Sequence, residues 1–309
     1  MKLDMVKGLV SVVGCVDFNA SDLTMNRSDF RFLHPLRVRW VEVDLQKIVF
    51  NGHYLMYLDT AMADYWRAIA LPYQDTMHAL GGDLYVVKSS LEYKASAEYD
   101  DLLHVGLRCA RIGNSSLLFE AGIFRGQQLL VKGELVYVYA DPHTKTAMPV
   151  PQALRDTMLG YEQGEPVTHL KLGSWDELKA LASPLRTEVF VHEQGVPQEM
   201  EWDTRDAHCL HAVLCNRLGL PVATGRLLPA EDGRAKIGRM AVLRQMRGQA
   251  FGAQVLQGLM SAARDRGDRA VLLHAQCSAE KFYQRQGFVS QGDVYQEAGM
   301  DHVNMVKTL

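Results

Sequence analysis

Apolar and polar residues are spaced in two different ways along the chain, and the change of pattern divides it into two halves. In the first half, residues 53–70 carry apolar positions at helical spacing, and an alternating run over residues 37–43 precedes them. Strand-like runs follow at 84–93, 102–109, 116–124 and 127–139. One long apolar helix, expected to be buried on most sides, followed by an antiparallel meander predicts a sheet wrapped around a central helix.

The second half alternates strands and helices instead. A short strand at 167–172 and a helix at 175–181 are followed by three successive strands at 211–215, 222–228 and 236–242. Next come a helix that ends near Gly267, a strand at 270–275, and a short helix that begins at a Ser278 cap and stops at Gly287. The two halves share no repeat, and together they predict an α+β chain.

The boundary between the halves falls where the strand pattern stops. Residues 141–165 contain Pro142, Pro149 and Pro151 before a short helical run. We therefore predict a leader over residues 1–30, a first domain over 31–145, a linker over 146–165 and a second domain over 166–309.

Composition narrows the class of protein. The chain has 309 residues, of which 48% are hydrophobic and 22% charged, and its net charge is -3, so neither a nucleic acid nor a membrane surface is an expected partner. Five cysteines, an odd number without a CxxC pair, argue against a disulfide framework and a zinc site, and they are consistent with a reducing cytoplasm. We expect no metal site.

The N-terminus has one ambiguous feature. Lys2 and Lys7 precede a short apolar run over 9–13, and the run ends near Cys15 in a pattern similar to a lipoprotein processing site. The run is much shorter than a membrane span, and Asp4 interrupts the basic leader. We expect a poorly ordered leader or an extra strand rather than an export signal, and a cytoplasmic protein.

The stretch 247–264 carries the first candidate chemistry, because it joins a strand to a helix through small residues. A backbone with little or no Cβ can bring its amides against phosphate oxygens, and the positive end of the helix dipole favours an anion. Arg247 adds a fork of donors. Small residues at a helix start often serve only tight packing, so this pattern alone is a weak indication of phosphate binding.

From Met240 onward the chain has a strand, then the small residues that begin the stretch 247–264, which we call the cradle, then a helix and a strand. This order, followed by FYQRQGF at 282–288, resembles the acyl-CoA-binding core of the GNAT acetyltransferase superfamily. The family's Arg/Gln-x-x-Gly-x-Gly/Ala pattern is matched with Ala250 in place of the first glycine. The resemblance implies that the strand edge binds the pantetheine arm of CoA and that the cradle binds its pyrophosphate. The implied CoA-binding residues are Met240, Ala241, Val242, Arg247, Gly248, Ala250, Gly252 and Ala253.

The same resemblance implies catalytic roles near the C-terminus. Tyr283 matches the position of a general acid that protonates the leaving thiolate, and we favour this role over the alternative of a core tyrosine. His302 and Glu297 are candidates for the base that deprotonates the acceptor amine. His274, inside an apolar strand, is more typical of a hydrogen-bonded core histidine.

Residues 185–206 resemble a compact bacterial subgroup of the GNAT superfamily, in which two short helices cover the acceptor pocket. This segment ends in an acidic run. The run either forms an acidic mouth that attracts an amine or is a solvated loop, and the sequence leaves both open. Its acidic residues are Glu199, Glu201, Asp203 and Asp206.

The first half resembles the hotdog-fold acyl-CoA thioesterases of the 4-hydroxybenzoyl-CoA thioesterase type, through WVEVDLQKIVFNGHYLMYLD at 40–59. Asp44 matches the aspartate that attacks the thioester or activates water, and Leu45-Gln46-Lys47 replaces the family's small loop. The Asn51 amide would polarise the carbonyl, and its side chain is expected to cap the helix. His53 is a weaker catalytic candidate, and Glu92 either faces a neighbouring subunit or is solvated.

Together these resemblances imply a bifunctional acyl-CoA enzyme. The first domain would hydrolyse an acyl-CoA, and the second would transfer an acyl group, expected to be acetyl, to an amine. In the alternative, only one domain is catalytic and the other is a CoA-binding regulatory or dimerisation module. Acyl-CoA is a substrate rather than a tightly bound cofactor. Hotdog domains place their active sites at a dimer interface, which implies a homo-oligomer, a dimer or a tetramer.

Overall fold

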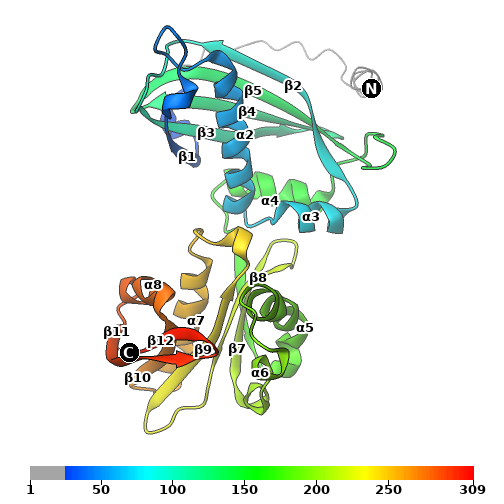
Figure 1. The fold of residues 1–309 in the computed structure, drawn as a ribbon. Helices are drawn as coiled ribbons and strands as arrows, with labels where there is room; N and C mark the ends of the chain where they lie inside the picture. Colours follow the sequence, from blue (N-terminus) through cyan, green and yellow to red (C-terminus); the bar gives the residue numbers. More distant parts are fainter. Residues whose placement is uncertain (1–24) are drawn as a thin grey trace. The chain divides into compact units, whose positions relative to one another are not determined.

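The computed structural model describes residues 25–309, and these form two compact units that divide after Val167 (Figure 1). Residues 1–24 of the predicted leader lie outside the described residues, as does the motif at Cys15. Each unit combines one β-sheet with helices, so the predicted α+β class is confirmed. Within residues 25–309, no helix has the length and apolarity that a membrane crossing requires.

The first unit is the predicted hotdog. Its antiparallel sheet has the order β1-β3-β4-β5-β2, and helix α2 (Asn51–Ala68) lies across one face (Figure 1). The strands are β1 (Phe32–Arg37), β2 (Asp83–Tyr93), β3 (Leu102–Ile112), β4 (Ser116–Arg125) and β5 (Gln128–Ala140). The buried side of α2 consists of large apolar and aromatic side chains, so the helix and the sheet share one core: Tyr54, Tyr57, Leu58, Ala61, Met62, Tyr65 and Trp66.

The expected strand over residues 37–43 is wrong. β1 ends at Arg37, and Trp40–Glu42 form a 3₁₀ turn that leaves the Trp40 side chain exposed. The turn closes because the Glu42 carboxylate accepts the Arg39 N–H at 2.7 Å and the Tyr57 hydroxyl at 2.8 Å. A tertiary bond to α2 therefore overrides the local alternation.

Helix α2 also departs from the prediction, because one side of it is open. Leu55 and Met56 are largely exposed, so the helix is not buried on most sides. Two further helices complete the unit: α3 (Tyr73–Leu80), which the sequence pattern did not indicate, and α4 (Gln152–Glu162). α4 lies inside the predicted linker, but its buried Leu154 and Met158 and the bonds from Arg155 to the Ile112 and Gly113 carbonyls, both at 2.8 Å, attach it to the first unit.

The second unit is a seven-stranded sheet with the order β11-β12-β10-β9-β8-β7-β6, in which only β9 and β10 pair in parallel. The strands are β6 (Thr168–Gly173), β7 (Leu210–Asn216), β8 (Pro221–Leu227), β9 (Arg234–Val242), β10 (Ala270–Gln276), β11 (Val289–Glu297) and β12 (Met300–Thr308). All strands predicted in this half are present, whereas the hairpin β11–β12 was not predicted.

Four α-helices accompany this sheet: α5 (Trp175–Arg186), α6 (Gln198–Glu201), α7 (Phe251–Asp265) and α8 (Glu280–Arg285). α5 extends beyond the predicted residue 181 and continues as a π-helix over Thr187–Glu193. The predicted Ser278 cap is wrong, because Cys277–Ala279 form a 3₁₀ turn and α8 begins after Ala279 without a side-chain cap. Gly287 ends the helix at φ 86°, as predicted.

Candidate active sites

Asp44 lies in a tight turn just before α2. Its N–H donates to the Ile48 carbonyl at 2.9 Å, and the Lys47 N–H donates back to the Asp44 carbonyl at 2.9 Å. Lys47 takes the left-handed conformation at φ 65° that closes the turn. The carboxylate Oδ1 accepts the Gln46 N–H at 2.8 Å, and no described residue bonds to Oδ2. One carboxylate oxygen is therefore available to water or substrate.

Glu42 fastens this turn to the helix, and sequence reasoning missed it. Its buried carboxylate contacts the Arg39 guanidinium at 2.6 Å as well as Tyr57, and its carbonyl accepts the Phe50 N–H at 2.9 Å. Burial raises the pKa of Glu42, but the hydrogen bonds from Arg39 and Tyr57 outweigh burial and leave this pKa below its usual value. Glu42 is therefore ionised, and it positions the Asp44 turn.

The start of α2 offers backbone donors rather than side-chain caps. Phe50 is the N-cap residue, so the expected capping by the Asn51 side chain is wrong. The amides of Asn51 and Gly52 have no hydrogen-bond partner among the described residues, as is usual in the first turn of a helix. The His53 ring packs edge-on against Phe50 at 6.1 Å, and its buried Nδ1 has no partner in the described structure.

A cavity of about 390 Å³ lies beside α2, against β2 and β5. Its polar residues, which sequence reasoning did not select, are Asp59, Thr60 and Ser89. The full lining is Leu55, Met56, Leu58, Asp59, Thr60, Val86, Ser89, Leu135 and Tyr137. None of Asp44, Asn51 and His53 belongs to it. Glu92 is exposed on β2 and contacts Lys94 at 2.9 Å.

In the second unit, strands β9 and β10 are paired over only the first part of their length and then separate. They pair only from Arg234↔Ala270 to Ile237↔Leu273, whereas β9 stays paired with β8 as far as Val242. Residues 238–242 therefore present an unpaired backbone edge toward β10. This edge contains Met240, Ala241 and Val242, and an extended amide-bearing ligand can bind to it as an added strand does.

The cradle follows directly and exposes a row of amides. The N–H groups of residues 248–253 have no hydrogen-bond partner among the described residues, and they lie at the N-terminus of the fifteen-residue helix α7. Gly248 has φ 87° and Ala250 has φ 60°. Ala250 thus adopts the left-handed conformation that glycine takes without steric cost, so the substitution preserves the path of the backbone.

Arg247 is not free in this structure. Its guanidinium forms two parallel bonds to the Glu193 carboxylate, at 2.6 and 2.7 Å, and its Nε donates to the Val242 carbonyl at 3.2 Å. The bonds from Arg247 hold the pKa of Glu193 below its usual value. Arg247 therefore ties the π-helix to the cradle, and any anion bound by Arg247 would compete with Glu193.

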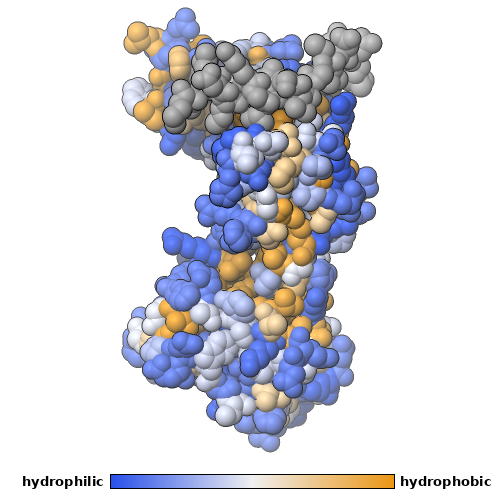
Figure 2. Space-filling view, turned by 90° about the vertical axis from the view of Figure 1, so that its right-hand side faces the viewer, coloured by the Kyte–Doolittle hydropathy of each residue, from blue (hydrophilic) through white to orange (hydrophobic). Residues whose placement is uncertain are grey.

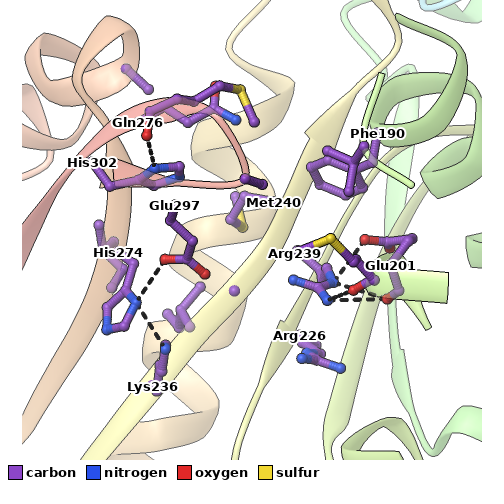
Figure 3. A pocket seen from close by; sticks show the side chains of 18 of the residues that line it. Phe190, Glu201, Arg226, Lys236, Arg239, Met240, His274, Gln276, Glu297 and His302 are labelled. Carbon is purple, nitrogen blue, oxygen red and sulfur yellow. Dashed lines mark hydrogen bonds and ion pairs between the residues drawn. The ribbon is translucent and has the colours of Figure 1, made fainter. Parts of the chain in front are cut away.

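A cavity of about 480 Å³ opens beside these strands, and all three predicted catalytic residues of this half line it. Figure 3 shows two of them, Glu297 and His302. Tyr283, Glu297 and His302 come from α8, β11 and β12. The Tyr283 ring packs edge-on against Phe282 and Phe288, and burial raises its pKa to about 12. His302 Nδ1 lies 2.9 Å from the Met300 carbonyl, so a neutral ring that donates there leaves Nε2 as an acceptor.

Neither interpretation of the acidic run survives for its buried members. The Arg186 guanidinium, 1% exposed, bonds to Glu201 and to Asp206 and packs against the Trp175 and Trp202 rings, 5.1 and 4.7 Å from their centroids. Further ion pairs join Arg226 to Asp203 and Asp206, and Arg239 to Glu201. Of the four acidic residues, only Glu199 is exposed and outside these ion pairs. The run is a buried ion network in the cavity wall, not an acidic mouth.

His274 faces the same cavity and is not a core histidine. Lys236 Nζ lies 3.1 Å and Glu297 Oε2 lies 3.4 Å from the same ring atom, His274 Nδ1 (Figure 3). One ring nitrogen cannot accept from the ammonium and donate to the carboxylate at once. Burial lowers the pKa of Lys236, and burial together with the nearby Lys236 charge lowers the pKa of His274. Lys236 was not selected from the sequence.

Comparisons with known proteins agree with both halves. Residues 46–132 match the Thioesterase superfamily, a region that begins just after Asp44, and residues 176–309 match the Acetyltransferase (GNAT) domain. In the second half, the chain is 36% identical over 124 residues to "Uncharacterized N-acetyltransferase YjcF" of Bacillus subtilis, a match that covers 40% of this chain and 87% of that protein.

Two solved structures extend the comparison. An acyl-CoA N-acyltransferase from Pseudomonas aeruginosa has 32% identity and a TM-score of 0.42, and it covers 45% of this chain and 99% of its own. Slr0204, a 1,4-dihydroxy-2-naphthoyl-CoA thioesterase from Synechocystis, has 20% identity and a TM-score of 0.39. The match covers 41% of this chain and 95% of Slr0204. With its fold and both family matches, the chain belongs to the GNAT acetyltransferases through its second domain, which follows a hotdog domain of the thioesterase superfamily.

Proposed function

We propose that the chain is a bifunctional enzyme that hydrolyses an acyl-CoA in its first domain and transfers an acyl group, acetyl in the simplest case, from CoA to an amine in its second. The observation that carries this proposal is the parted pair β9–β10 beside the unbonded amides of residues 248–253. An extended arm with amide groups and a pyrophosphate at its end is complementary to these two features, and CoA has both.

In the proposed transfer, the amine nitrogen attacks the thioester carbonyl carbon, the C–S bond breaks, and the thiolate leaves with the bonding electrons. Tyr283 gives its proton to that thiolate, and its raised pKa keeps it protonated at neutral pH. His302 or Glu297, directly or through water, takes the proton from the amine. Neither step requires a metal or a redox cofactor.

In the proposed hydrolysis, Asp44 either attacks the carbonyl carbon, which forms an anhydride that water then cleaves, or takes a proton from the water that attacks. By either route the C–S bond breaks, and the products are a carboxylic acid and the CoA thiol. The free Oδ2 of Asp44 and the unbonded amides of Asn51 and Gly52 support this assignment, because such amides can stabilise the developing oxyanion. His53 is a weaker candidate for a polar contact to the substrate.

We further propose a homo-oligomer, a dimer or a tetramer, formed through the hotdog domain in the cytoplasm, where CoA thioesters are available. The edge strand β2 and the open side of α2 support the interface, because Leu55, Met56, Val86 and Tyr93 are largely exposed. Figure 2 shows apolar side chains exposed among polar ones on the side where β2 lies in Figure 1.

A second candidate function deserves a test because Asp44 does not line the cavity beside α2. In this alternative, the hotdog domain is only a scaffold for dimerisation or a regulatory CoA site, and the GNAT domain alone is catalytic. The test is a panel of acyl-CoA esters assayed for thiol release with and without a mixed amine library. We expect both amine-independent and amine-dependent release; a complete lack of the first would favour the scaffold.

Tyr283→Phe removes the proposed acid and keeps the packing of the ring. We expect the turnover of amine-dependent transfer to fall about 10²-fold, with the affinity for CoA nearly unchanged, because the hydroxyl acts only as the thiolate leaves. The matched variant Tyr295→Phe removes a hydroxyl that bonds to Asn304 at 3.1 Å, and we expect it to transfer at nearly the normal rate. An unchanged turnover in Tyr283→Phe would remove this tyrosine from its role.

A further inference from the structure

On one side of the GNAT cavity, the positive and negative charges in the wall balance one another. Arg186, Arg226 and Arg239 are three cations, and the network pairs them with the three carboxylates of Glu201, Asp203 and Asp206. The bonds from Arg226 hold the pKa of Asp203 at about 2, so this carboxylate stays ionised. This network therefore presents no uncompensated charge of either sign to a ligand.

Two further cations line the cavity outside this network of ion pairs. Lys236 projects from β9, and within the described structure no carboxylate forms an ion pair with its ammonium group. Its described polar contact is His274 Nδ1 at 3.1 Å, which is a neutral acceptor at best. The Arg205 guanidinium also lines the cavity and makes no hydrogen bond or ion pair to a described residue. Glu297 is the one lining carboxylate outside the network.

A ligand that enters this cavity meets two cationic groups and one anionic group. Lys236 and Glu297 approach the same nitrogen of His274, at 3.1 and 3.4 Å, so the cationic and anionic positions are neighbours (Figure 3). The ammonium group of a simple alkylamine would pair with Glu297, but its positive charge would add to the positive charge of Lys236 nearby. A molecule with both an ammonium group and a carboxylate matches both positions.

We infer that the acceptor of the GNAT domain is an amine that also carries a carboxylate, such as an amino acid, and that Lys236, assisted by Arg205, binds this carboxylate. The inference rests on the proposed acyl transfer, whose acceptor class it names. Lys236 is then a specificity-determining residue: it recognises a part of the acceptor that does not react, while the amine meets Glu297 and His302.

The test uses amine pairs that differ only in the carboxylate: alanine and alaninamide, phenylalanine and phenylalaninamide, lysine and lysinamide. With the full chain and acetyl-CoA, we expect a higher kcat/KM for at least one acid than for its amide. The amine of the amide is less basic and is deprotonated more readily. Amine basicity alone would therefore favour the amide over the acid. In Lys236→Met, we expect kcat/KM for that acid to fall about 10- to 100-fold while the amide changes little.

Two variants serve as controls. Lys236→Arg keeps a cation, and we expect it to restore part of the preference for the acid. Lys179→Met removes an exposed lysine on α5 and should leave the preference unchanged. Equal kcat/KM for acids and amides in the unmodified chain, or a preference that persists in Lys236→Met, would overturn the inference.

Failure of the inference and failure of the transfer are distinguished by a binding measurement. Ligand-observed NMR with the CoA-saturated chain reports binding of the same acids and amides whether or not they are acetylated. If no amine is acetylated, selective binding of an acid that Lys236→Met abolishes still supports the carboxylate site. Absence of acid-selective binding in that measurement refutes the site.

Discussion

Asp44→Asn is expected to lower amine-independent thioester hydrolysis by about 10²- to 10⁴-fold, the range that a catalytic acid or base contributes. The substitution removes the charge that attacks the carbonyl or activates water. It keeps a side-chain oxygen that can accept the Gln46 N–H, so the turn before α2 should persist. The measurement is thiol release from the preferred acyl-CoA of the panel, without an amine.

The matched control is Asp59→Asn, which alters the carboxylate that lines the cavity beside α2. We expect Asp59→Asn to hydrolyse at nearly the normal rate. Amine-dependent release by the GNAT domain of the same chain checks that each variant is folded. Full hydrolysis by Asp44→Asn would contradict the proposed mechanism, and loss of hydrolysis in Asp59→Asn alone would move the catalytic carboxylate to the helix.

Arg186→Met is expected to lower the free energy of unfolding of the GNAT domain by about 3 to 5 kcal/mol. This is the cost of removing one partner of a buried ion pair and leaving the other charge uncompensated. Met keeps an apolar side chain packed against Trp175 and Trp202 but leaves Glu201 and Asp206 with fewer compensating charges in a buried wall. Chemical denaturation of the full chain, followed by hydrogen exchange in α5 and β7, measures the change domain by domain.

Arg264→Met is the control, because Arg264 is exposed on α7 and its loss should change stability by less than about 0.5 kcal/mol. The hotdog domain of Arg186→Met should exchange as in the unmodified chain. A loss of stability no larger than in Arg264→Met would mean that the network is neutral, as some buried ion pairs are when apolar side chains replace them.

The catalytic candidates of the GNAT half illustrate how much of a site can be predicted from the sequence. Tyr283, Glu297 and His302 were selected through a resemblance, and the structure gathers them around one cavity from three different elements. Their roles remain predictions. In the hotdog half, Asp44 and Asn51 lie on consecutive segments before and at the start of α2, but the cavity beside that helix is lined by other residues. In the homo-oligomer that we propose, a partner subunit would complete such a site.

The missed residues share a physical cause. Glu42 and Lys236 look like ordinary polar strand residues, because a single sequence carries no signal for which groups will surround a charged side chain in the fold. The acidic run was misread for the same reason: Glu201 pairs with Arg186, fifteen positions earlier, and with Arg239, thirty-eight positions later. Such pairs form only when α5, α6 and β9 come together.

By itself, the sequence determined the two families, the long helix, the meander, the strand order along the GNAT half and the position of the cradle. These features depend on spacing within 4 to 18 residues, because periodic burial and turn residues act locally. Only the tertiary structure decided which charges are compensated: it neutralised the acidic run, ended β1 at Arg37 through Glu42, and left Lys236 without an ion pair to a described carboxylate. Compensation depends on distances between side chains far apart in the chain, and folding sets those distances.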